Sequence, residues 1–219
     1  MKTPQPMPSR TVKDSDTTTN SADAASTLLD SARDIFLAEG VKGLSVRRVA
    51  QQAGCTTMAV YSRFGGKEGL LGALFDEGFT RLADAQARVD AALKPAARVL
   101  ALCRAYRDTA QAYPHHYALM LGAFSGEHTP SPNSSARAMA TLRTLTAAVS
   151  ATFLAQTAGE QVSDQRIGRR SEAVAHQLFA FCHGWVSLER IGFFQDAQSL
   201  DLAFDRAVRA LLVGTNATS

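Results

Sequence analysis

Four cationic side chains lie within Ser45–Lys67, a stretch that reads SVRRVAQQAGCTTMAVYSRFGGK. A guanidinium, as in Arg47, Arg48 and Arg63, can donate two parallel hydrogen bonds to guanine or to a phosphate. Lys67 follows two glycines and is predicted to open a helix, where free N–H groups favour an anion. On their own, the three arginines are equally consistent with a solvated surface. The chemistry that the stretch would support is binding to a nucleic acid.

Two short helices joined by a tight turn are predicted to position these side chains. Ser45 is placed to cap the first helix, because its hydroxyl can accept a hydrogen bond from a free N–H group of the first turn. This helix runs to about Gln52 and is broken at Gly54. Thr56 is placed to cap the second helix in the same way. Two short helices with a glycine turn are typical of a helix-turn-helix DNA-binding unit.

The second helix has an inner and an outer face. Val60 and Phe64 are four residues apart and should face inward. The side chains left to face outward are Thr57, Met58, Ala59, Tyr61 and Ser62. An amphipathic helix over Ala24–Glu39, which ends at Gly40, is predicted to support the unit through one apolar stripe, formed by Leu28, Ala32, Ile35 and Phe36.

The remainder of the chain is predicted to form a larger helical body. An apolar face from Val99 to Tyr106 lies between breaks at Pro95 and Pro114, and residues 125–135 and 157–168 are predicted as loops. The other body helices are predicted at residues 67–93, 115–124, 136–156, 170–191 and 200–213. The predicted fold class is all-α, with a disordered arm over residues 1–23, a DNA-binding domain over 24–70, a ligand-binding and dimerisation domain over 71–213 and a tail over 214–219. The arm is interpreted as a passive tail or a DNA-contacting segment.

Composition is consistent with a globular protein in a reducing compartment. The chain has 219 residues, 46% of them hydrophobic, with a formal net charge of +3. The charge permits an anionic partner but does not require one. The 3 cysteines, Cys55, Cys103 and Cys182, argue against a disulfide framework. We find no signal peptide and expect no membrane-spanning segment, so the expected location is the cytoplasm.

The body contains aromatic, sulfur-containing and histidine side chains that could line a ligand cavity. A cavity of this composition would suit a small hydrophobic or aromatic molecule. Each of these residues has an alternative role in the hydrophobic core. The candidates are Cys103, Tyr106, His116, Tyr117, Met120, Phe124, Phe153, Phe181, Cys182 and Trp185.

Motifs for a metal site or an enzyme are weak or missing. His115, His116, Cys182 and His183 could in principle bind an ion, but adjacent residues seldom bind the same ion and no CxxC or HExxH spacing occurs. Glu68 stands where a phosphate-binding loop requires Ser or Thr. We therefore expect no catalytic residue, no metal and no cofactor.

The N-terminal motifs together resemble the signature of TetR-family transcriptional repressors. The resemblance covers Ala24 to Leu74 and includes the ending Tyr-x-x-Phe-x-x-Lys-Glu-x-Leu, at Tyr61–Leu70. Downstream, Tyr106–Gly122 and the stretch His183–Glu189 resemble the WHG type of TetR C-terminal domain. Two departures are Gly66, where many relatives have Ser, and Cys55, where a branched aliphatic residue is common.

The resemblance implies a homodimeric DNA-binding protein that a small effector controls. The recognition-helix positions would be Thr57, Met58, Ala59, Tyr61 and Ser62, with Arg47 as a further base reader. Thr56, which caps that helix, would also belong to the DNA-binding residues. Phosphates would be bound by Ser45, Arg48, Tyr61, Arg63 and Lys67. The dimer would form through the helices at about 170–191 and 200–213, whose apolar faces are otherwise part of the core. An alternative is a helical ligand-binding or protein-interaction module that has lost DNA binding.

Overall fold

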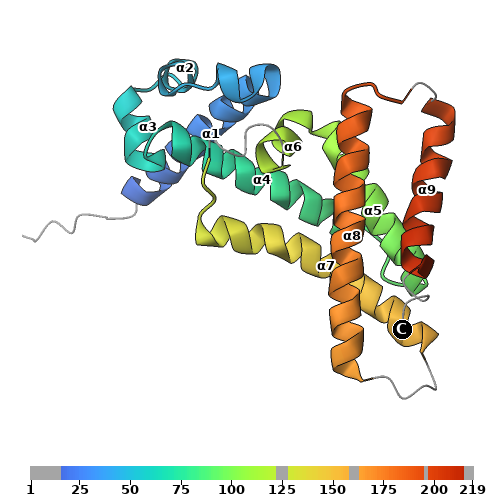
Figure 1. Ribbon diagram of the computed structural model, residues 1–219. Coiled ribbons are helices and arrows are strands. Elements are labelled where there is room, and N and C mark those ends of the chain that lie inside the picture. Colours follow the sequence, from blue (N-terminus) through green and yellow to red (C-terminus); the bar gives the residue numbers. More distant parts are fainter. Residues whose placement is uncertain (1–15, 122–127, 158–162, 195–196, 215–219) are drawn as a thin grey trace, which may run out of the picture. The chain divides into compact units, whose positions relative to one another are not determined.

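The computed structural model describes residues 16–121, 128–157, 163–194 and 197–214. Within these ranges the chain forms nine α-helices and no strand (Figure 1), which confirms the predicted all-α class. Contacts between residues divide the chain into two compact units, one that ends at Leu70 and one that begins at Leu71.

The first helix, α1 (Asp16–Gly43), begins earlier than predicted. Residues 16–23, predicted to belong to a disordered arm, are helical, and residues 1–15 lie outside the described part of the chain. The sequence from Asp16 to Glu39 contains no proline or glycine, so nothing in it interrupts a helix. Gly40 has a φ of 67° and a non-helical ψ, which confirms the predicted break. The predicted apolar stripe is buried, with Ala32 and Phe36 fully inaccessible.

The helices α2 (Val46–Gln52) and α3 (Thr57–Phe64) have the predicted caps. The Ser45 hydroxyl accepts a hydrogen bond from the Arg48 amide at 3.3 Å. The Thr56 hydroxyl accepts one from the Ala59 amide, also at 3.3 Å. Gly54 adopts a φ of 66° in the turn between the two helices. Local capping and one glycine therefore set both helix boundaries.

The helix α4 (Lys67–Ala87) ends before residue 93, the predicted end. The reason lies in the residues that follow. The Asp90 side chain accepts a hydrogen bond from the Ala92 amide at 2.8 Å, an Asx-turn that competes with helix continuation. Pro95 then starts the next helix, because proline lacks the N–H that the first helical position leaves unused.

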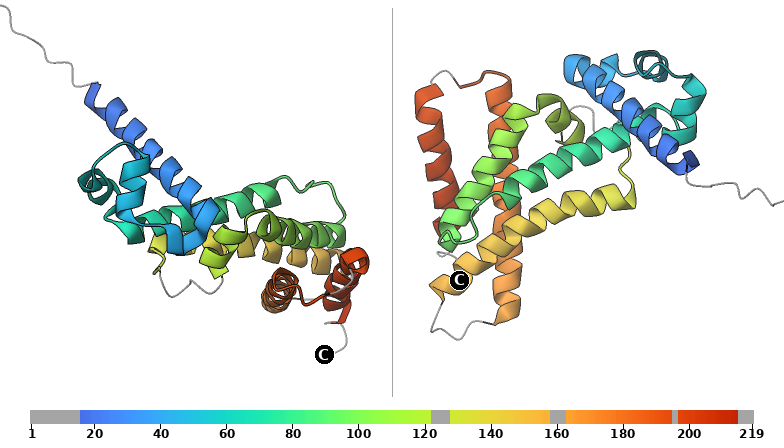
Figure 2. Two further views of the ribbon diagram at one scale, coloured as in Figure 1. Left: turned by 90° about the horizontal axis from the view of Figure 1, so that it is seen from above. Right: turned by 180° about the vertical axis from the view of Figure 1, so that it is seen from behind.

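Five more helices complete the C-terminal unit (Figure 2). The α7 and α8 helices begin earlier than predicted, because Ser131 and Ser163 cap them through their hydroxyls. The α5 helix is central and contacts α6, α7, α8 and α9, while α8 also packs against α7 and α9. The bounds are α5 (Pro95–Ala112), α6 (Pro114–Leu121), α7 (Pro132–Gln156), α8 (Asp164–Arg190) and α9 (Ala197–Gly214).

One helix of the body is long and apolar enough to cross a membrane by length and composition, contrary to the expectation that no segment would be. This helix is α7, and it packs against α5 and α8. Leu145, Val149 and Phe153 are buried in that packing. These three apolar side chains of α7 therefore belong to the core of the body.

Candidate nucleic-acid interface and ligand cavity

The side chains predicted to contact DNA lie on the surface of α2, α3 and the start of α4. On α3, Val60 is fully buried, whereas Met58 and Tyr61 are 72% and 56% exposed. Phe64, predicted to face inward, is half-buried. Ser45, Ala59 and Lys67 are partly accessible as well. The exposed members of the predicted set are Arg47, Arg48, Thr56, Thr57, Met58, Tyr61, Ser62 and Arg63.

The cations on this surface differ in their partners. Arg48 is held by Glu39 through two hydrogen bonds, at 2.6 Å from Nη1 and 2.5 Å from Nη2. The same Nη1 donates to the Gly43 carbonyl at 3.0 Å. Arg47 and Arg63 form no ion pair within the described residues, and both are exposed to solvent. Arg47 and Arg63 are therefore better placed than Arg48 to bind an added anion.

Two glycines shape the junction between α3 and α4. Gly65 ends α3 in the left-handed conformation, with a φ of 72°, and its amide donates to the Tyr61 carbonyl at 2.9 Å. Gly66 has a φ of 114°, and a Cβ there would lie 3.1 Å from Tyr61 Cε1. A serine at this position would be strained in this conformation. Gly66 thus leaves room for the Tyr61 ring and places Lys67 at the N-terminus of α4.

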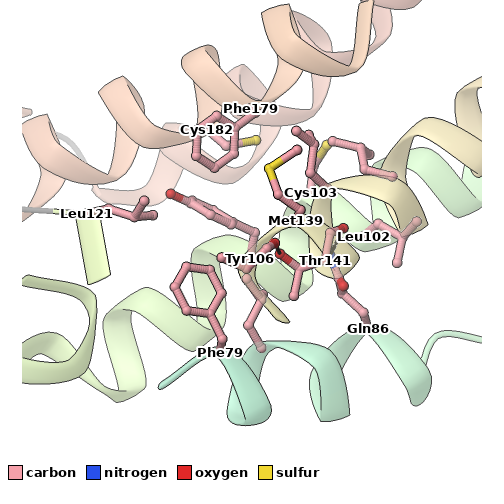
Figure 3. Close-up of a pocket in the computed structure, with 14 residues that line it drawn as sticks. Phe79, Gln86, Leu102, Cys103, Tyr106, Leu121, Met139, Thr141, Phe179 and Cys182 are labelled. Carbon is pink, nitrogen blue, oxygen red and sulfur yellow. Dashed lines mark hydrogen bonds between the residues drawn. The ribbon is translucent and has the colours of Figure 1, made fainter. Parts of the chain in front are cut away.

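The body contains an apolar cavity with a volume of about 190 Å³ (Figure 3). Its walls come from α4, α5, α6, α7 and α8, and they include Phe79 and Leu82 of α4 and Phe179 of α8. Three residues predicted for a ligand site, Cys103, Tyr106 and Cys182, line it. None of the described lining residues is Asp, Glu, Lys, Arg or His. This cavity is therefore suited to an uncharged molecule.

Polar groups in the cavity wall are few, and most are already paired. Gln86 Nε2 donates to the Thr141 carbonyl at 3.2 Å, and the Thr141 hydroxyl donates to the Ala138 carbonyl at 2.7 Å. Tyr106 is only 7% exposed, and its hydroxyl has no hydrogen-bond partner among the described residues. Burial, followed by the nearby Tyr117, raises the pKa of the Tyr106 hydroxyl well above its usual value. The hydroxyl therefore stays protonated and able to donate a hydrogen bond.

The two cysteines of the cavity lie next to each other on different helices. Contact with the Cys182 thiol, followed by burial, raises the pKa of the Cys103 thiol. Both thiols are free and buried. A buried thiol with a raised pKa carries little thiolate, so Cys103 contributes a soft apolar wall more than a reactive group.

The remaining residues predicted for ligand binding lie elsewhere. His116, Tyr117 and Met120 meet Tyr106 at a second recess with a volume of about 10 Å³, room for one water molecule at most. The Tyr117 hydroxyl lies 2.7 Å from His183 Nδ1. These contacts place the three side chains in the packing of α6 rather than in the main cavity.

Three aromatic side chains predicted for the ligand site do not line the main cavity, and Phe124 lies outside the described residues. Phe153 is buried beneath the Arg170 guanidinium, 4.1 Å from its ring centroid. Phe181 and Trp185 pack on Phe204 of α9, with ring centroids 5.4 and 5.7 Å apart. The apolar surface of α8, predicted to form a dimer interface or part of the core, is thus used partly to hold α9.

The sequence analysis missed the contributions of α4 and α7 to the cavity. Phe79, Leu82 and Thr141 line the cavity but were not among the predicted ligand-binding residues. It also missed Arg107, which is 9% exposed and lies on the buried face of α5. Arg107 Nη2 donates to Glu189 at 2.5 Å and its Nη1 to Asp201 at 2.7 Å. A cation one turn after Cys103, within an otherwise apolar face, was the signal that could have predicted such a buried pair.

Comparison with protein families assigns both parts of the chain. Residues 28–74 match the model described as bacterial regulatory proteins of the tetR family. Residues 99–211 match the model described as the tetracyclin repressor-like C-terminal domain. No curated protein matches the chain.

Solved structures share the fold along nearly the whole chain. A protein of unknown function from Rhodococcus sp. RHA1 is 26% identical, with a TM-score of 0.68 over 87% of this chain and 94% of that one. A bacterial regulatory protein in the tetR family from Rhodococcus RHA1 is 17% identical, with a TM-score of 0.63 over 86% and 96%.

A third structure is a variant of TetR from Acinetobacter baumannii AYE in complex with minocycline. It is 18% identical to this chain, with a TM-score of 0.57 over 87% of this chain and 95% of that one. The two family models together cover most of the sequence, and the helix-turn-helix geometry agrees with the first of them. The chain belongs to the TetR family of transcriptional regulators.

Proposed function

We propose that this regulator is a homodimeric repressor that binds a near-palindromic operator and is released from it by a small, uncharged effector. The observation that carries the proposal is the exposed face of α3, where Thr57, Met58, Tyr61 and Ser62 are open to solvent while Val60 anchors the helix. Side chains on such a face of a recognition helix meet base edges in the major groove. Because bacterial operators lie in the cytoplasm, the proposed function places this regulator there.

The proposed phosphate contacts flank this face. Lys67 stands at the first position of α4, where the free N–H groups and the helix dipole favour an anion. Ser45, Tyr61 and Arg63 are further candidates. Arg48 remains a candidate as well, but its two hydrogen bonds to Glu39 compete with a phosphate. The proposal assigns base reading to Arg47 and to the exposed residues from Thr56 to Ser62.

The surface of α8 and α9 supports the proposed dimer. On α9, Leu202 and Val213 are 64% and 62% exposed and lie on one face, three turns apart. On α8, Leu188 and Gly184 are exposed, and a Cβ on Gly184 would meet nothing within 4 Å. A glycine inside a helix costs about 1 kcal/mol relative to alanine. Gly184 lies one turn before the exposed Leu188, so the two residues form an open, partly apolar strip on which a partner helix could approach closely.

The helix α4 supplies the proposed link between effector and DNA. Its first residue, Lys67, is a proposed phosphate contact, and its later residues Phe79, Leu82 and Gln86 line the cavity. An effector that favours a different position of these side chains would move the helix as a unit. The two recognition helices of a dimer must lie about one DNA turn apart, roughly 34–36 Å, or a multiple of it. A coupling free energy of about 1–3 kcal/mol would change operator affinity roughly 5- to 150-fold.

A gel shift tests the proposal with the DNA upstream of the protein's own gene and with a scrambled duplex of equal length. We expect a retarded band with the upstream DNA at concentrations at which the scrambled duplex stays free. Gly184→Arg should convert the dimer to a monomer in light scattering and abolish that band, whereas Gly168→Arg, on an open part of the same helix, should leave both unchanged. Equal binding of both duplexes, or none, would favour a module that has lost specific DNA binding.

A further inference from the structure

We infer that the effector of this regulator is a neutral molecule with one aromatic ring and one hydrogen-bond acceptor, which the Tyr106 hydroxyl binds inside the cavity. This inference rests on the proposed ligand-controlled function and narrows it to a chemical class. It follows from three properties of the cavity: its size, the absence of charged side chains among its described lining residues, and the buried Tyr106 hydroxyl, which has no hydrogen-bond partner in the described chain.

The size of the cavity suits an effector with about one ring. An apolar cavity of about 150 Å³ is sufficient to bind benzene. The cavity in this protein has a volume of about 190 Å³, which leaves room for a ring with a short substituent. A drug-sized or multi-ring molecule would need a larger space, since most ligand pockets are about 300–1,000 Å³ in volume.

The chemistry of the walls favours an aromatic ring. Phe79 and Phe179 bring aromatic rings from α4 and α8, and the Phe179 ring meets the Tyr106 ring edge-on, with centroids 5.9 Å apart. Aromatic rings prefer such edge-to-face contacts. The sulfur atoms of Cys103 and Met139, which Figure 3 shows on the α5 and α7 sides, also interact favourably with an aromatic ring.

The charge of the walls excludes an ionised effector. No described lining residue is an acid, a base or a histidine that would neutralise a carboxylate or an ammonium. Transfer of an unpaired charge into an apolar site costs far more free energy than ring burial returns. A carboxylate of the same size as a neutral ligand should therefore bind much more weakly.

The unused donor determines where the polar atom of the effector lies. Tyr106 is more than nine-tenths buried, and its hydroxyl is without a partner in the described chain. In Figure 3 its ring reaches across the cavity, with the hydroxyl end directed toward Leu121. A ligand carbonyl, ether or hydroxyl oxygen at that end would accept a hydrogen bond from Oη. Of the other candidate donors, the Thr141 hydroxyl already donates to the Ala138 carbonyl, and the Gln86 amide uses one of its two N–H groups on the Thr141 carbonyl.

Isothermal titration calorimetry on the full chain without DNA tests this inference with three probes: acetophenone, ethylbenzene and benzoate. We expect acetophenone to bind the unaltered protein. Its affinity should fall about 3- to 10-fold in Tyr106→Phe. Its affinity should not change in Tyr113→Phe, because Tyr113 lies outside the main cavity. Ethylbenzene should change less than about 2-fold in either variant, and benzoate should bind at least about 10-fold more weakly than acetophenone.

A second pair of variants locates the bound probe. Met139 lines the cavity and is 49% exposed, so Met139→Trp can fill the space without disturbing buried packing. It should abolish acetophenone binding, whereas Leu154→Trp, at a 51% exposed position of the same helix, should not. The inference would be overturned if benzoate bound as tightly as acetophenone. It would also be overturned if Tyr106→Phe bound acetophenone with unchanged affinity, or if neither neutral probe bound. A failed gel shift without ligand would instead count against DNA binding, since calorimetry does not depend on it.

Discussion

In the N-terminal unit, Arg47 and Arg63 are exposed and form no ion pair with described residues, whereas in the body Arg107 is buried and holds two carboxylates. Arg104 of the body is likewise paired, with Asp205. An unpaired cation that is exposed to water costs little free energy, and it is available to bind a phosphate. A buried cation must be paired, because an isolated charge in a low-dielectric interior is very unfavourable.

Arginine therefore has two different roles in this chain, one structural and one in binding. Burial and pairing identify Arg107 as a structural cation that ties α5 to α8 and α9. Exposure without a partner marks Arg47 as available for binding. Arg48 lies between the two cases, since it is exposed but paired with Glu39. Substitutions at these positions should therefore differ in both the size and the kind of their effect.

Arg107→Ala should give the largest change, in stability. It leaves Glu189 buried without its cation, and loss of one partner of a buried pair costs about 3–5 kcal/mol. Urea unfolding of the full chain measures the change. The double variant Arg107→Met with Glu189→Leu removes both charges and should recover most of the lost stability. If the double variant is as unstable as the single one, packing rather than the ion pair explains the effect.

Arg47→Ala should come next, and it should affect specificity more than stability. A guanidinium that reads guanine contributes roughly 1–3 kcal/mol of discrimination against the wrong base. Fluorescence anisotropy with the operator and with random DNA should show weaker binding to the operator and nearly unchanged binding to random DNA. Tyr61→Phe should likewise alter sequence preference. An equal loss of affinity on both duplexes would contradict base reading by either residue.

Local features of the sequence predicted the N-terminal unit well, whereas the cavity depends on contacts that no local pattern specifies. Ser45, Thr56 and the glycine breaks act within one turn of the chain, so their effect could be predicted from sequence. Cys103 and Cys182 are far apart in sequence and meet only because α5 packs on α8. Phe181 is apolar by its residue type, but the helical periodicity of the sequence could not predict whether its side chain would face the cavity or α9.

Helix boundaries show the same limit at a smaller scale. The hydroxyls of Ser131 and Ser163 cap α7 and α8, yet each lies in a stretch whose polar composition predicted a loop. Composition reflects the average tendency of a stretch to form a loop or a helix, whereas a single capping side chain determines where the helix begins. The predicted DNA-contacting residues were easier to select, since the inward position of Val60 determines which neighbours on α3 face outward.

Lys67→Ala should weaken binding by less than Arg47→Ala does on the operator, and it should do so equally on all DNA sequences. Removal of one phosphate contact lowers the slope of log affinity against log salt by about 0.9. Anisotropy titrations at several salt concentrations, on operator and on random DNA, measure that slope. Glu68→Gln, at the next and exposed position of α4, provides a matched control in which the slope should not fall. An unchanged slope in Lys67→Ala would exclude the phosphate role.

Glu39→Gln should have the smallest effect on stability, because the Glu39–Arg48 pair is exposed to solvent and screened by salt. The hydrogen bonds from Arg48 hold the pKa of the Glu39 carboxyl below its usual value. A depressed pKa in the folded state means that the pair stabilises the fold above the unfolded-state pKa. This contribution is lost as the pH falls through the lower, folded-state pKa. Thermal unfolding should therefore show a slightly lower stability for Glu39→Gln at pH 7, and this difference should disappear in acid. A difference of equal size in acid would contradict the assignment.

The same variant frees Arg48 at neutral pH. Tighter binding to random DNA would assign Arg48 to the phosphates, and unchanged or weaker binding would assign it to holding α2 against α1.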